Sequence, residues 1–76
     1  MSGKPIPPDS FLTECIPLGA VNGQKRWRNA ASDRIYTWDS LHGEIEVYNN
    51  RGKHLGVLNT TGDFIKEAVK GRTINV

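Results

Sequence analysis

The residues best suited to chemistry in this chain are three carboxylates and a histidine that lie within eight positions of one another. They are Asp39, His42, Glu44 and Glu46. A carboxylate or an imidazole can act as a general base, and a second such group can act as a general acid. Cleavage of a phosphodiester also needs a cation for the charge that develops on the phosphate. The segment therefore predicts acid–base chemistry without a metal, with the cation supplied from elsewhere in the chain.

Two segments that alternate between apolar and polar residues flank this cluster and predict β-strands, at residues 34–39 and 44–49. Residues 40–43 then form the loop of a hairpin. The predicted cross-strand pairs are Asp39–Glu44, Trp38–Ile45 and Thr37–Glu46. A slip by one residue would turn the carboxylates into the core, so this register is well constrained.

A second hairpin is predicted around Asn50-Arg51-Gly52, which fits a three-residue loop with glycine in the left-handed conformation. Its register pairs Tyr48 with His54 and Glu46 with Gly56, so that the glycine leaves open space beside Glu46. The predicted core face carries Tyr36, Trp38, Ile45, Val47, Leu55 and Val57. The opposite face carries Asp39, Glu44, Glu46, Tyr48 and His54, with His42 at its rim.

The whole pattern predicts a single small, mainly β domain, a strongly twisted antiparallel meander with a short N-terminal helical turn. The helical turn is expected at residues 11–15 and a loop at 19–23. Further strands are expected at 24–29 and 64–69, with a last short one at 72–76. Residues 1–8 hold three prolines and a glycine, which predicts a tail or linker stub before a domain at 9–76.

Composition excludes several kinds of site. The net charge of +2 permits a nucleic-acid partner without requiring one. No apolar run approaches the ~18 residues of a membrane helix and no signal peptide is evident, so no stable membrane association is expected.

The single cysteine, Cys15, excludes an internal disulfide and a cysteine metal site. No cofactor is expected, and zinc lacks its usual ligand spacing, but magnesium on Asp39, Glu44 and Glu46 stays open.

The acidic face also has a simpler interpretation, because polar residues that alternate with apolar ones commonly form only the solvated side of a sheet. Glu44 and Glu46 alone favour that interpretation. Asp39 beside Glu44 argues against it, since like charges in contact cost stability and raise the pKa of a carboxyl group. His54 has two interpretations, as a packing partner of Tyr48 or as a phosphate ligand.

Four motifs occur in a characteristic order along the chain. They are Lys25-Arg26-Trp27, the run from Arg34 through Trp38-Asp39-Ser40-Leu41-His42-Gly43-Glu44-Ile45-Glu46 to Tyr48, Gly52-Lys53-His54-Leu55-Gly56, and Gly71-Arg72-Thr73-Ile74. In this order they resemble the C-terminal cytotoxic domain of the ribosome-inactivating colicins and cloacin. The match from Trp38 to Tyr48 is specific, whereas residues 5–22 lie outside the resemblance.

The resemblance implies a metal-independent endoribonuclease that cuts small-subunit (16S) ribosomal RNA in the decoding centre and leaves a 2′,3′-cyclic phosphate. It implies that Glu46 is the general base for the ribose 2′-hydroxyl and that His42 is the acid for the leaving 5′-oxygen. It further implies that Asp39 orients His42, that Glu44 contributes to the same field, and that Arg72 neutralises the phosphorane.

Partners follow from the same resemblance: ribosomal RNA, a cognate immunity protein, and a larger secreted toxin that delivers the domain to the cytoplasm of a target cell. The predicted RNA-binding residues are Lys25, Arg26, Trp27, Arg28, Tyr48, Lys53 and His54. Trp27 or Tyr48 would stack a base, although Trp27 fits a cap on the core equally well. Three other functions stay open, namely a nuclease for another RNA such as tRNA, a non-catalytic RNA-binding β-domain, and a protein–protein module.

Overall fold

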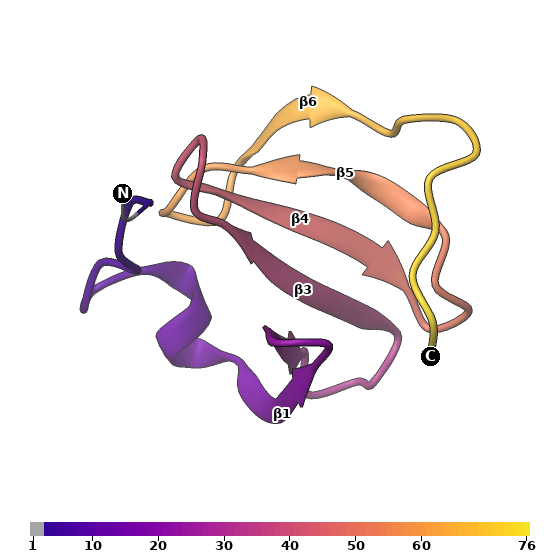
Figure 1. Cartoon of the computed structure of the whole chain (residues 1–76), viewed down its shortest axis with the longest axis horizontal. Coiled ribbons are helices and arrows are strands. Elements are labelled where there is room, and N and C mark those ends of the chain that lie inside the picture. Colours follow the sequence, from indigo (N-terminus) through magenta and orange to yellow (C-terminus); the bar gives the residue numbers. More distant parts are fainter. Residues whose placement is uncertain (1–2) are drawn as a thin grey trace.

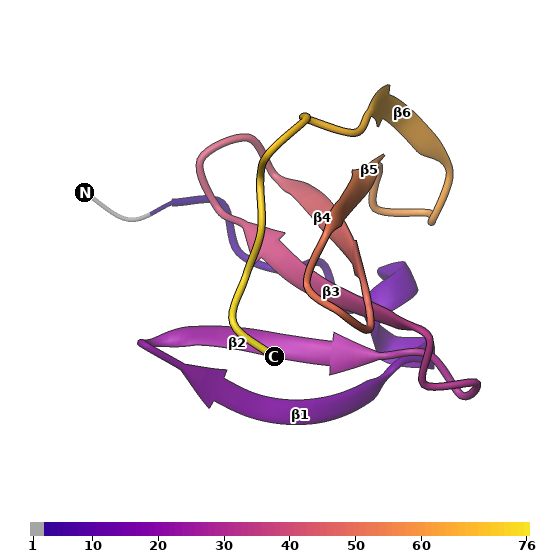
Figure 2. The same ribbon diagram turned by 90° about the vertical axis from the view of Figure 1, so that its right-hand side faces the viewer.

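Short strands joined by tight turns make up most of the chain, which the computed structural model describes over residues 3–76. All the strands belong to one antiparallel sheet in which they follow one another in chain order (Figure 1). The elements are the 3-10 helix η1 (Phe11–Glu14) and the strands β1 (Ile16–Val21), β2 (Gln24–Arg28), β3 (Arg34–Asp39), β4 (Glu44–Asn49), β5 (His54–Leu58) and β6 (Phe64–Glu67). The predicted mainly β meander with an N-terminal helical turn is confirmed, and Figure 2 shows its twist between the β1–β2 hairpin and β5.

Strand β1 was not expected, because residues 19–23 were predicted to be a loop. Every residue of β1 is exposed, so the strand has no alternation of buried and exposed positions that a sequence pattern would show. A turn at Asn22-Gly23 joins it to β2, and both residues have positive φ angles, 54° and 79°. That is the backbone of a two-residue hairpin turn, for which Asn-Gly is the preferred sequence.

The hairpin that carries the chemical cluster has the predicted register. Asp39 pairs with Glu44, Trp38 with Ile45, and Thr37 with Glu46, and residues 40–43 form the loop between β3 and β4. Cross-strand partners share a face of the sheet, so the side chains of Thr37 and Glu46 lie on the face opposite Trp38 and Ile45.

The predicted register of the next hairpin is wrong beyond its first pair. Tyr48 does pair with His54, but Val47 pairs with Gly56 and Glu46 with Val57, because a β-bulge inserts Leu55 between the two pairs. Val57 therefore lies on the face of Glu46 and outside the main core cluster, although its side chain is buried.

The expected space beside Gly56 is also absent. Gly56 has a φ of 150°, and a Cβ atom there would lie only 2.7 Å from the backbone oxygen of Lys66 in β6. The glycine is thus required for the close approach of β6 and does not open the sheet to a ligand.

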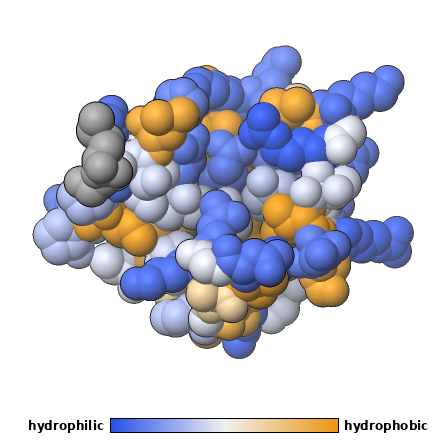
Figure 3. Space-filling view, in the orientation of Figure 1, coloured by the Kyte–Doolittle hydropathy of each residue, from blue (hydrophilic) through white to orange (hydrophobic). Residues whose placement is uncertain are grey.

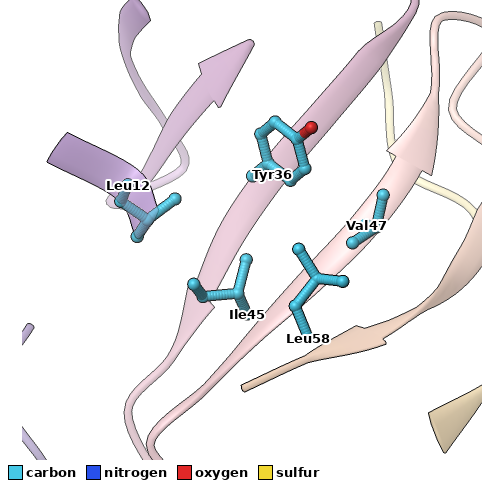
Figure 4. Close-up of a cluster of buried hydrophobic side chains, with 5 residues drawn as sticks. All are labelled: Leu12, Tyr36, Ile45, Val47 and Leu58. Atoms are coloured by element: carbon cyan, nitrogen blue, oxygen red, sulfur yellow. The ribbon is translucent and has the colours of Figure 1, made fainter. Parts of the chain in front are cut away.

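The core lies on the face of the sheet that η1 covers. Its buried apolar side chains are Leu12, Tyr36, Ile45, Val47 and Leu58 (Figure 4). Leu58 replaces the predicted Val57 because of the bulge, and Trp38 and Leu55 pack against this cluster while staying partly exposed. Phe11 packs edge-on against Tyr36 with ring centroids 5.3 Å apart, which fixes η1 on the sheet.

The two ends of the chain differ from their predictions. Strand β6 ends at Glu67 instead of residue 69, and the expected strand at 72–76 is reduced to a single bridge between Lys53 and Thr73. Residues 1–2 of the predicted tail lie outside the described residues, but Ile6 packs against the core and Lys4 bonds to Ser40. No helix among the described residues is long and apolar enough to cross a membrane. On the surface in Figure 3, apolar side chains form separate patches among polar ones.

Candidate active site

The β3–β4 loop holds the imidazole of His42 in one orientation. Asp39 Oδ1 accepts hydrogen bonds from the backbone N–H groups of Leu41 (3.0 Å) and His42 (3.2 Å). Asp39 Oδ2 lies 2.7 Å from His42 Nδ1, so this ring nitrogen donates to the carboxylate. The side chain of His42 is 57% exposed, and its Nε2 is therefore the nitrogen that can meet a substrate.

The pKa of Asp39 moves in the opposite direction from the one predicted for neighbouring carboxylates. Partial burial would raise it, but the hydrogen bonds from the side chain and backbone of His42, the charge of His42 and the Leu41 N–H together lower the pKa below its ordinary value of 3.8. The Asp39 carboxylate is thus stabilised as an anion beside His42 Nδ1.

Glu46 lies in the middle of β4, and its side chain is only 12% exposed. Its Oε1 atom receives two contacts of 2.8 Å, one from His54 Nε2 and one from Arg72 Nη1. Within residues 3–76, no protein group hydrogen-bonds its second oxygen, Oε2. The carboxylate is therefore held from one side and presents one oxygen for proton transfer.

His54 is buried and takes a single tautomer. Its Nδ1 atom accepts a hydrogen bond of 2.9 Å from the backbone N–H of Val69, so Nδ1 carries no proton. The proton sits on Nε2, which donates to Glu46 Oε1. The backbone N–H of His54 also donates to Arg72 O (3.0 Å), so this residue joins Glu46 to the segment that carries Arg72.

Lys66 is a site residue that the sequence pattern did not indicate. Its Nζ atom lies 2.8 Å from Glu44 Oε1, and this hydrogen bond is the main reason that the pKa of Lys66 is raised. Lys66 reaches the site because it pairs with Val57 across β5 and β6. Two β-bulges set this pairing, one between β4 and β5 and one between β5 and β6. Because the sequence pattern did not reveal the bulges, it could not place Lys66 in the site.

All five predicted catalytic residues line one hollow of about 220 Å³. They are Asp39, His42, Glu44, Glu46 and Arg72, and Lys66, Glu67, Val57 and Val69 complete the walls. Asp39, Glu46 and Arg72 also line an adjoining hollow of about 340 Å³ that contains Tyr48. The structure thus brings together a carboxylate from β4, an imidazole from the β3–β4 loop and a guanidinium from the C-terminal segment.

Comparisons with known proteins give the family of the chain. A family model described as Cytotoxic matches residues 17–75. The chain belongs to this family. Colicin E3 of Escherichia coli is 44% identical over 45 residues, which cover 57% of this chain and 8% of colicin E3. Cloacin and colicin-E6 of the same organism are each 40% identical over 50 residues, covering 63% of this chain and 9% of theirs. The chain therefore spans less than a tenth of the length of these relatives.

The predicted RNA-binding residues of this Cytotoxic-family domain do not share one surface. Arg26 and Arg28 pair with Thr37 and Ile35, on the face of Glu46, and Arg26 Nη1 donates to Asn75 O. Trp27 pairs with Tyr36 and packs against the core, so it lies on the opposite face.

Tyr48 and His54 lie within the site rather than on its surface. Tyr48 is 6% exposed and His54 is 1% exposed, and their rings pack edge to face with ring centroids 5.2 Å apart. Burial, followed by the charge of Glu46, raises the pKa of the Tyr48 hydroxyl. His54 is better placed to hold Glu46 than to contact a phosphate. Lys53 is exposed beside it, and Lys25 is exposed at the other end of the sheet.

A divalent cation would meet competition in this site. One ligand atom from each of Asp39, His42 and Glu44 lies within 4.8 Å of the others, a set that differs from the magnesium ligands considered above by replacing Glu46 with His42. However, Asp39 already pairs with His42, and Glu44 with Lys66. A cation would share these two carboxylates with His42 and Lys66, and the chemistry derived below uses protein groups alone.

Proposed function

We propose that this domain is a toxin ribonuclease that cleaves small-subunit (16S) ribosomal RNA in the decoding centre by metal-independent acid–base catalysis. The observation that carries the proposal is the single hollow lined by Asp39, His42, Glu44, Glu46 and Arg72. Membership of the Cytotoxic family supports the toxin class, and the similarity to colicin E3, cloacin and colicin-E6 supports the same target.

The mechanism assigns one proton transfer to each of two groups. Glu46 Oε2 takes the proton of the ribose 2′-hydroxyl, and the 2′-oxygen attacks the adjacent phosphorus. As the bond from phosphorus to the 5′-oxygen breaks, protonated His42 gives its Nε2 proton to that oxygen. The products are a 2′,3′-cyclic phosphate and a free 5′-hydroxyl.

The neighbouring groups prepare these two transfers. Asp39 fixes the ring of His42 by accepting from Nδ1. Arg72 supplies positive charge to the phosphorane, which carries more negative charge than the substrate, so its contribution is largest in the transition state. Glu44, paired with Lys66, adds negative charge beside His42.

We also propose that the domain works as one module of a larger toxin. The region of each relative that matches this chain makes up only 8% or 9% of that relative's length. The module would be secreted with its carrier, act in the cytoplasm of the target cell where ribosomes are found, and be neutralised in the producer by a cognate immunity protein.

The test incubates the purified domain with intact bacterial ribosomes in excess chelator and maps the ends of the small-subunit RNA. One discrete cut in the decoding centre, with a cyclic phosphate at its 3′ end, is expected. His42→Ala and Glu46→Gln should abolish the cut, whereas Glu14→Gln, an exposed glutamate in η1, should not.

Each other result identifies an alternative. Intact ribosomal RNA with cleavage of tRNA would move the target to another RNA. RNA binding that His42→Ala leaves unchanged, without any cleavage by the parent domain, would indicate a binding module. Loss of the cut in chelator would restore the magnesium hypothesis.

A further inference from the structure

A third hollow, of about 490 Å³, adjoins the candidate active site at the end of β3. Gln24, Trp38 and Ser40 line both this hollow and the one that contains Glu46 and Arg72. Lys4 and Lys25 form further walls, and none of the described residues that line it is acidic. Its volume falls within the range of roughly 300–1,000 Å³ that holds small ligands in proteins.

Residues 3–6 build one side of this hollow, and they are held in place by hydrogen bonds. The backbone N–H of Lys4 donates to Ser40 O at 2.7 Å, and Trp38 Nε1–H donates to Lys4 O at 2.9 Å. Figure 1 shows this N-terminal segment beside the loop between β3 and β4. Ile6, further along, packs against the core.

The side chain of Lys4 lies against the same loop. A Cβ atom on Gly43 would be 2.8 Å from Lys4 Cδ, so the aliphatic part of the lysine covers Gly43, the residue after His42. Lysine commonly packs its methylene groups on a surface in this way while its ammonium group stays in solvent. The charge of Lys4 is therefore anchored close to the catalytic loop.

This wall belongs to the part of the chain that the Cytotoxic family model does not match, since the match begins at residue 17. Lys25 and Trp38 lie within the matched range. The hollow thus combines residues inside the family match with residues outside it.

The charges of the two hollows differ in a way that suits an RNA strand. Asp39 and Glu46 stand in the catalytic hollow and repel phosphates other than the one that Arg72 contacts. The acid-free hollow next to it is lined by two lysines, which can contribute positive charge for a phosphate. Trp38 offers an aromatic surface for a base or ribose, and the carboxamide of Gln24 can donate and accept hydrogen bonds.

We propose that this hollow is a nucleotide subsite, in which Lys4 and Lys25 bind the RNA phosphate next to the scissile one and Trp38 and Gln24 contact its nucleoside. The proposal rests on the ribonuclease function proposed above. The ligand is single-stranded RNA, and the subsite acts in binding rather than in the chemical step.

The test compares Lys4→Ala with Lys4→Arg, which keeps the charge, and with Arg51→Ala. Arg51 is an exposed control in the β4–β5 turn, at the end of β4 away from the catalytic loop. Each substitution is made in the parent domain and in an inactive His42→Ala background. The first set gives KM and kcat on ribosomes, and the second gives Kd for a fluorescent single-stranded oligoribonucleotide as a function of salt.

Losing one phosphate contact should reduce the slope of log Kd against log salt by about 0.7, which at 0.1 M salt is about a fivefold weaker Kd. Lys4→Ala should show this change and a similar rise in KM, with kcat unaltered. Lys4→Arg and Arg51→Ala should stay near the parent values.

Equal Kd and KM values for Lys4→Ala and Arg51→Ala would overturn the subsite. A fall in kcat without a change in KM would also overturn it, because Lys4 would then act only by holding the catalytic loop. If the parent domain cuts no RNA, the ribonuclease function fails, and the Kd comparison still decides whether Lys4 contacts RNA.

Discussion

Two substitutions of His54 should affect catalysis and stability separately, because the two ring nitrogens of His54 have different partners. Nε2 donates to Glu46, and Nδ1 accepts from Val69. Asparagine carries its side-chain oxygen near the position of Nδ1, and glutamine carries its amide nitrogen near that of Nε2. His54→Asn thus keeps the bond to Val69, and His54→Gln keeps the bond to Glu46.

The magnitudes follow from the two bonds. A hydrogen bond to a charged group contributes about 1.5–3 kcal/mol, so a misplaced Glu46 in His54→Asn should lower kcat by roughly ten- to a hundredfold. His54→Gln leaves the Val69 N–H without its partner, which costs about 1 kcal/mol of unfolding free energy at a partly buried position. For a chain of 76 residues the total stability is about 4–11 kcal/mol, so both variants should fold.

Three measurements check this prediction. Single-turnover cleavage of ribosomes gives the chemical rate, urea unfolding gives the stability, and the imidazole ¹⁵N spectrum of the parent domain gives the tautomer of His54. We expect the Nε2–H form, a slow His54→Asn and a nearly active His54→Gln. Equal cleavage rates for the two variants, or a proton on Nδ1, would refute the hydrogen-bond assignment.

Three further predictions concern other parts of the site. Because the pKa of Asp39 is lowered in the folded state, its contribution to stability is present above its ordinary value of 3.8 and is lost as the pH falls from there through the folded value. Asp39→Asn should therefore flatten the acid side of a plot of urea midpoint against pH, and an unchanged acid side would contradict the lowered pKa. Arg72→Ala should lower kcat by roughly a hundredfold with little change in KM, since its charge acts mainly in the transition state; a change in KM alone would assign it to binding. Gly56→Ala should destabilise the domain by about 1–3 kcal/mol in urea unfolding, because its Cβ would meet the Lys66 carbonyl oxygen and its φ is positive, and an unaltered stability would contradict the bulged register.

The β3–β4 hairpin was predictable because a single physical constraint specified it. Apolar and polar residues alternate in residues 34–39 and 44–49, and only one register places Ile45 in the core and Glu46 on the opposite face. That register is the observed one. The same constraint failed for β5, since a bulge at Leu55 shifts the pattern by one residue, and the apolar Val57 fits either face.

Other features had weaker or overlooked signals. Asn22-Gly23 is a strong hairpin signal, but β1 lacks the buried face that would support a strand on its own. The pair of His54 with Val69 joins positions 15 residues apart through a backbone group, and side-chain patterns carry no information about such a bond. Arg72 was identified only through the resemblance, although its contact with Glu46 is direct.

The cation of this site depends on a segment with almost no regular structure of its own. Beyond β6, the segment from Val69 to Arg72 is exposed, and Lys53 forms one bridge to Thr73 after it. His54 contacts this segment twice, through Val69 N–H and Arg72 O. The imidazole that bonds Glu46, the proposed base, therefore also holds the segment that carries Arg72, the proposed cation. A change that frees the segment should remove Arg72 from the phosphate and the donor from Glu46 together, so substitutions at His54 and Arg72 should combine to less than the sum of their separate effects on the activation free energy.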